Sequence, residues 1–135
     1  MTSKSKKILC EISAGELLDK ISILEIKLKE VKDKSDQEEI KKEYTMLKEI
    51  QNSSLEANDK IDNLFKSLKE VNSELWKSED VTRMCEKNKD FGEKFIKTSR
   101  SIYFTNDKRA RIKSEINKIL GSNIREVKQH PDYES

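Results

Sequence analysis

The segment ANDKIDNLFKSLKEVNSEL, residues 57–75, carries the longest helical repeat in the chain. Its apolar residues follow one another at spacings of 4, 3, 4, 3 and 4, and they are Ala57, Ile61, Leu64, Leu68, Val71 and Leu75. Because an α-helix has 3.6 residues per turn, this spacing gathers the apolar side chains on one side and leaves the charged ones on the other. The segment therefore predicts a long amphipathic helix, from about residue 55 into the eighties, that must pack against other elements.

Three further segments show the same periodicity and predict helices at residues 14–33, 37–52 and 91–120. Helix starts are indicated by Ser or Asp followed three residues later by Glu, a pair that can satisfy the first backbone amides. These pairs are Ser13/Glu16, Asp36/Glu39, Ser53/Glu56 and Asp90/Glu93. Between the second and third helices the only break is Asn52-Ser53-Ser54; we predict that the helices separate there, and one continuous helix is the alternative. Gly121 predicts a left-handed cap that ends the last helix.

The composition supports a single all-α domain over residues 1–135, namely a four-helix antiparallel bundle with long charged faces. Charged residues make up 40% of the chain, well above the roughly 25% of ordinary domains. Three glycines and one proline are too few for the turns of a sandwich, a barrel or a doubly wound sheet. The terminal segments 1–12 and 122–135 lie outside the predicted helices. Apolar residues in both segments predict a short two-stranded ribbon, and they are Ile8 to Ile12 and Ile124 with Val127.

Several classes of protein and of site do not fit the sequence. No apolar run approaches the roughly 18 residues of a membrane span, and the basic start is followed by too few apolar residues for a signal peptide. Cys10 and Cys85 form no spaced pair, which suits a reducing compartment. His130 is the only histidine and no acidic or cysteine cluster surrounds it. We therefore expect a cytoplasmic protein without a metal, a cofactor or a catalytic triad.

The last predicted helix carries polar residues on the side that should be buried. With Phe95 placed on that side, the same face or its border also receives Thr98, Ser99, Thr105, Asn106, Arg109 and Lys113. A buried cation must be paired, hydrated or turned toward a cavity, and the first helix offers Glu16, Asp19 and Glu25 as partners. Three interpretations stay open: a helix break near Thr105-Asn106-Asp107, internal ion pairs, or a polar pocket in which Arg100, Arg109, Arg111 and Lys113 hold an anion.

The charges are distributed unevenly along the chain. Residues 94–128 contain ten basic and three acidic residues, a balance of +7, whereas the rest contains 18 basic and 23 acidic residues, a balance of −5. A basic stripe can bind nucleic acid, but Tyr103 and Phe104 are too few for a platform on which bases stack. We therefore expect a solvated or internally paired basic face rather than a nucleic-acid groove.

Several motifs resemble those of a small uncharacterised family of bacterial and phage helical proteins, often encoded near surface-polysaccharide genes. The most specific is ISAGELLDKI at residues 12–21, and the others are Ile23 to Lys27, Leu75-Trp76, Asp90-Phe91-Gly92, Arg100 to Tyr103, Asn106-Asp107 with Arg109, and Ile116-Asn117 through Gly121-Ser122. The resemblance covers nearly the whole chain and brings no catalytic assignment. It implies that one polar set recurs in such proteins: Glu16, Asp19, Lys20, Arg100, Asn106, Asp107 and Arg109.

The first helix has a second apolar line through Ile23 and Ile26. One interpretation is a helix that lies between two neighbours; the other is a surface through which the chain forms a homo-oligomer.

The charged residues on the buried side of the last helix, together with the +7 balance of residues 94–128, favour a non-catalytic binding module. It would hold a small anion, such as a nucleotide or a phospho-sugar, between the first and last helices. The candidate ligand-binding residues are Glu16, Asp19, Lys20, Arg100, Tyr103, Asn106, Arg109 and Lys113. A scaffold whose ion pairs only set helix register is the main alternative. A cofactor-free enzyme similar to the all-helical chorismate mutases, which hold a dianionic substrate among basic side chains, is a third and less favoured hypothesis.

Overall fold

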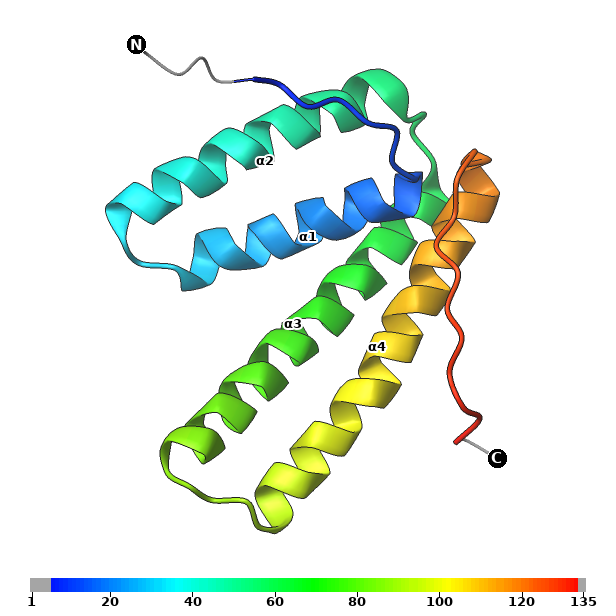
Figure 1. Ribbon diagram of the computed structural model, residues 1–135. Coiled ribbons are helices and arrows are strands. Elements are labelled where there is room, and N and C mark those ends of the chain that lie inside the picture. Colours follow the sequence, from blue (N-terminus) through cyan, green and yellow to red (C-terminus); the bar gives the residue numbers. More distant parts are fainter. Residues whose placement is uncertain (1–5, 134–135) are drawn as a thin grey trace.

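The computed structural model describes residues 6–133, and it consists of two helical hairpins that meet at one end and diverge from there (Figure 1). The first hairpin contains α1 (Ala14–Glu30) and α2 (Lys34–Ser54), and the second contains α3 (Asp59–Lys87) and α4 (Glu93–Leu120). The four predicted helices are confirmed, and the predicted break between the second and third falls just after Ser54.

The first helix, α1, is the centre of this arrangement. It packs against α2, α3 and α4, whereas the backbone of α2 lies close to that of no described helix except α1. The largest fully buried apolar side chains gather where the hairpins meet, and they are Leu18 and Ile21 of α1, Leu68 of α3 and Ile116 of α4. Ile26 is also buried, with 6% of its surface exposed. A helix buried on several sides explains why α1 carries more than one apolar line.

The helix caps agree with the sequence at two ends and differ at three. Ser13 caps α1 by accepting a hydrogen bond from the backbone N–H of Glu16 at 3.1 Å, as predicted. Gly121 ends α4 with φ 64°, also as predicted. The other starts are capped by residues outside the predicted pairs, which are Asp33 for α2, Asn58 for α3 and Gly92 for α4. In a chain rich in Ser, Asp and Glu, the pairing pattern arises too often to locate every helix start.

The last helix is continuous from Glu93 to Leu120, so the interpretation with a break near Asn106 is wrong. Within the helix, the Thr105 hydroxyl donates to the backbone carbonyl of Ser101, one turn earlier, at 2.9 Å, and does not act as a cap.

The predicted terminal ribbon is also wrong, since residues 6–133 contain no strand. The C-terminal tail, residues 122–133, instead runs back beside α4 (Figure 1). A hydrogen bond from the Asn123 amide to the Glu11 carboxylate, at 3.0 Å, links it to the N-terminal segment. Two isolated strands without a sheet to cover them are marginal in water, and Ile8 and Val127 remain exposed. None of the described helices has a stretch long and apolar enough to cross a membrane.

Gly15 lies where α1 packs directly against α4. A Cβ atom at this position would come within 2.6 Å of the backbone oxygen of Lys113 and 2.9 Å of the Asn117 side-chain oxygen. Both atoms are held by the α4 backbone or by hydrogen bonds, so they cannot move aside without shifting the helix.

We therefore expect Gly15→Ala to destabilise the protein by about 1–3 kcal/mol, even though alanine is the better helix former. Urea unfolding followed by circular dichroism measures the change. Gly92→Ala is the control, because a Cβ at Gly92 would approach only the Asp90 carboxylate, at 3.3 Å, and φ is −81°. Equal stability of the two variants would show that the helices do not touch at Gly15 in solution.

Candidate functional site

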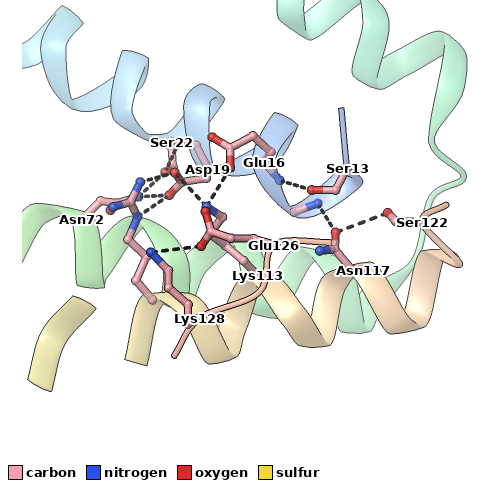
Figure 2. A network of polar contacts seen from close by, with 12 residues as sticks. Ser13, Glu16, Asp19, Ser22, Asn72, Lys113, Asn117, Ser122, Glu126 and Lys128 are labelled. Carbon is pink, nitrogen blue, oxygen red and sulfur yellow. Dashed lines mark hydrogen bonds and ion pairs between the residues drawn. The ribbon is translucent and has the colours of Figure 1, made fainter. Parts of the chain in front are cut away.

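A buried carboxylate, Asp19 of α1, lies where α1, α3 and α4 meet (Figure 2). Only 1% of its surface is exposed. The Arg109 guanidinium of α4 binds it through two nitrogens, with Nε donating to Oδ1 at 2.9 Å and a terminal nitrogen donating to Oδ2. Asn72 of α3 donates from Nδ2 to Oδ1 at 2.9 Å. Such a two-nitrogen contact is the geometry in which arginine binds a carboxylate most strongly.

The same cluster satisfies its remaining polar groups internally. The Asn72 amide also donates to the Ser22 hydroxyl at 2.7 Å, and that hydroxyl donates to the Asp19 backbone carbonyl at 2.8 Å. Within the described part of the chain, no buried side-chain nitrogen or oxygen lacks a hydrogen-bond partner. The cluster is therefore closed, and a buried polar network that is fully satisfied stiffens the structure around it.

A second ion pair lies one turn away along α4. Lys113 is buried, and its Nζ donates to the Glu16 carboxylate at 2.8 Å and lies 3.9 Å from Asp19 Oδ2. Arg109 and Lys113 thus face Asp19 and Glu16, two cations against two carboxylates. The interpretation with internal ion pairs is therefore the one that describes these four residues.

The beginning of α1 is held by side chains from the end of α4. Asn117 accepts the backbone N–H of Gly15 at 2.7 Å, and Ser122 accepts the backbone N–H of Ala14 at 2.9 Å. The Ser122 hydroxyl also donates to the Asn117 side-chain oxygen at 3.3 Å. The first amides of a helix have no partner within it, so these contacts tie the start of α1 to α4.

The pKa values follow the geometry of the network. Burial by itself raises the pKa of Asp19, but the hydrogen bonds from Arg109 and Asn72 and the positive charges of Arg109 and Lys113 outweigh it, so the pKa lies below its ordinary value. The pKa of Arg109 is raised, chiefly by its hydrogen bonds to Asp19. Both groups are therefore charged at neutral pH.

A groove opens between α4 and the C-terminal tail, next to Arg109. Its volume is about 710 Å³. The lining residues are Arg100, Tyr103, Phe104, Asn106, Asp107 and Arg109 of α4 and Lys128, His130, Pro131 and Tyr133 of the tail. The Tyr133 ring lies 5.3 Å from the Phe104 ring and 6.5 Å from the Tyr103 ring, centre to centre, and its hydroxyl donates to Asp107.

The eight candidate residues separate into three groups. Glu16, Asp19, Arg109 and Lys113 form the buried network, while Arg100, Tyr103 and Asn106 line the groove together with Arg109. Lys20 belongs to neither, since it is exposed and lies 4.0 Å from Glu43 of α2. The structure therefore brings seven of the eight candidates together in two adjoining sites along the middle of α4.

The two apolar candidates for self-association differ in exposure. Ile26 is buried within the chain, whereas Ile23 is half-buried and lines an open cleft of about 430 Å³ beside Leu75 and Trp76. The burial of Ile26 fits the interpretation in which α1 lies between neighbours. A homo-oligomer through this surface stays a prediction.

Four further polar residues form hydrogen bonds around the buried network or at the start of α1 and were not among the candidates. They are Ser22, Asn72, Asn117 and Ser122. Asn72 follows Val71 of the apolar stripe directly, and a polar residue beside such a stripe is a weak signal that it turns inward. Asn117 and Ser122 belong to the motifs that resemble the uncharacterised family. In residues 6–133, no group of three or more His, Cys, Asp or Glu side chains comes together in a way that could hold a metal ion.

We expect Arg109→Ala to lower the free energy of unfolding by about 3 kcal/mol, because it leaves a buried carboxylate without its main partner. Arg111→Ala is the matched control, since Arg111 is an exposed arginine of the same helix, and its effect should stay within about 0.5 kcal/mol. Urea denaturation of both variants tests this. If the two lose the same stability, the Asp19 pair does not form in solution.

The pH dependence of stability should also report on Asp19. Its pKa is lower in the folded chain than the ordinary 3.8 that the unfolded chain has, so the unfolded state takes up a proton first as pH falls. The stabilisation is complete above the unfolded pKa and is lost as pH falls through the folded pKa. Between pH 5 and 2, wild type should lose stability more steeply than Asp19→Asn, and parallel curves would contradict this; Glu115→Gln, an exposed acid, serves as control.

Comparison with known proteins places the chain in a family without giving it a function. No curated protein and no solved structure matches it. A family model described as a family of unknown function does match, over residues 8–133, and this confirms the resemblance seen in the motifs. Because the match spans nearly the whole chain, the protein belongs to this family of unknown function, DUF6165.

Proposed function

We propose that this protein is a non-catalytic binding module that holds a small anionic ligand, a nucleotide or a phospho-sugar, in the groove between α4 and the C-terminal tail. The observation that carries the proposal is the lining of the groove, which combines cationic and aromatic side chains in about 710 Å³. Pockets for small ligands have volumes of about 300–1,000 Å³ and similar mixed walls.

The charge for an anion comes chiefly from Arg100. Arg109 is engaged with Asp19, and Lys128 lies 3.2 Å from Glu126. Among the described residues, Arg100 forms no ion pair, and it is exposed at the wall of the groove. A guanidinium can bind a phosphate through two parallel hydrogen bonds, so Arg100 is the side chain best suited to hold the anionic group.

The aromatic side chains supply the rest of the surface. Tyr103 and Phe104 present their rings from α4, and Tyr133 faces them from the tail. Flat rings suit the faces of a base or a sugar, and the Asn106 amide can both donate and accept hydrogen bonds. A pocket of this size that combines aromatic rings with charged and polar groups favours one small amphipathic ligand over a long polyanion.

Isothermal titration calorimetry against a panel of nucleotides and sugar phosphates tests the proposal. For a ligand that binds wild type, Arg100→Ala should weaken binding by roughly tenfold or more, because a hydrogen bond to a charged group contributes about 1.5–3 kcal/mol. Lys94→Ala removes a positive charge from the same helix at an exposed position outside the groove, and it should bind like wild type. The proposal is wrong if no compound of the panel binds, or if both variants bind equally.

A further inference from the structure

A small polar cavity of about 140 Å³ adjoins the groove, between α1, α4 and the tail. It shares Asn106, Arg109 and Lys128 with the groove, and its other lining residues are Glu16, Ala110, Lys113 and Glu126. A water molecule has a share of about 30 Å³ in the liquid, so the cavity has room for a phosphate group and not for a nucleotide.

The charges around this cavity are balanced only with the help of the tail. Three cations line it, Arg109, Lys113 and Lys128, and two carboxylates line it, Glu16 and Glu126. Asp19 lies behind Arg109 and binds it. Without Glu126, three positive charges would face the two negative charges of Glu16 and Asp19, which leaves an excess of +1.

Glu126 differs from the other two carboxylates in how it is held. Asp19 and Glu16 belong to α1 and are bound by buried cations of α4. Glu126 belongs to the exposed tail, and its carboxylate lies 3.2 Å from the ammonium of Lys128, two residues away. Figure 2 shows its side chain beside Lys113. The tail is neither helix nor strand here, so moving this carboxylate breaks no regular secondary structure.

The cations keep N–H groups for another acceptor. A guanidinium has five N–H donors and an ammonium has three. The bonds to Asp19 use two nitrogens of Arg109, and the bond to Glu16 uses one donor of Lys113. An anion in the cavity would therefore meet donors without breaking the ion pairs that hold the helices together.

From this geometry we infer that the cavity is the phosphate subsite of the groove, and that the carboxylate of Glu126 in its wall supplies the negative charge that a ligand phosphate would otherwise bring. The inference rests on the proposed function and adds the place of the anionic group and the part of the chain that competes for it. A phosphate monoester would place its phosphate in the cavity as Glu126 turns away from the cations, with its sugar or base in the groove beside the aromatic side chains.

Calorimetry with inorganic phosphate as the probe, on the full chain, tests the inference. Glu126→Gln removes the competing charge and keeps the size of the side chain, so we expect it to bind phosphate roughly tenfold more tightly than wild type. Glu115→Gln is the matched control, because it changes the net charge equally at an exposed position of α4 that lines no described cavity. Adding Lys128→Gln to Glu126→Gln should remove most of the gain, and adding Lys118→Gln should not.

The outcomes separate this inference from the proposed function. Equal phosphate affinity of Glu126→Gln and Glu115→Gln would overturn the subsite, even if nucleotides bind the groove and Arg100→Ala weakens them. Tighter phosphate binding by Glu126→Gln alone would support the subsite, even if no nucleotide or sugar phosphate binds wild type, and in that case only the proposed function is wrong. Because Glu126 is exposed, circular dichroism should show the same fold for both variants.

Discussion

The ion pair between Asp19 and Arg109 is the contact on which the arrangement of three helices depends. A carboxylate with 1% of its surface exposed can stay charged only if cations and donors surround it. Its partners come from different helices, Arg109 from α4 and Asn72 from α3, so the pair defines how both lie against α1. Apolar packing alone would specify this register weakly, since the fully buried apolar residues are few. A satisfied buried network penalises every alternative register, because each would leave a buried charge unpaired.

The same network determines which charges remain for binding. From the sequence, Arg109 and Lys113 suggest an anion site between α1 and α4, but Asp19 and Glu16 neutralise them there. What remains is the outer side of α4, where Arg100 is exposed and the tail completes a groove. The basic excess of residues 94–128 is therefore a poor guide to surface charge. Arg109 and Lys113 hold the fold together, so a ligand can reach only the N–H groups that their ion pairs leave free, together with exposed cations such as Arg100.

The fold was more predictable than the site, for reasons that individual residues illustrate. The stripe from Ile61 to Leu75 predicts α3 because a helix periodicity needs no partner to be recognised. Four of the candidates meet in the network, since a cation on a buried face demands an acid; of the three acids considered on α1, Glu16 and Asp19 face α4, whereas Glu25 pairs with Lys69 of α3. The role of Asn72 was not predicted, because the sequence shows a polar residue beside an apolar stripe in the same way whether its side chain faces solvent or Asp19. The position of the tail beside α4 was not predicted, because the tail has no periodicity. The Tyr133 side chain contacts Phe104 and Asp107 of α4, and no local sequence pattern encodes these contacts.

Both proposed sites lie along residues 100–113 of α4, where the tail runs beside the helix. The largest fully buried apolar side chains gather where the hairpins meet, and the two hairpins diverge beyond that junction. At the junction, α1 and α4 present side chains whose positions the buried ion pairs hold, so a ligand need not order them. The tail opposite them lacks regular hydrogen bonding and can shift at lower cost. A groove with one rigid wall and one adaptable wall can exchange an internal carboxylate for an external anion without disturbing the helices, and this is the property that links the fold to the proposed function.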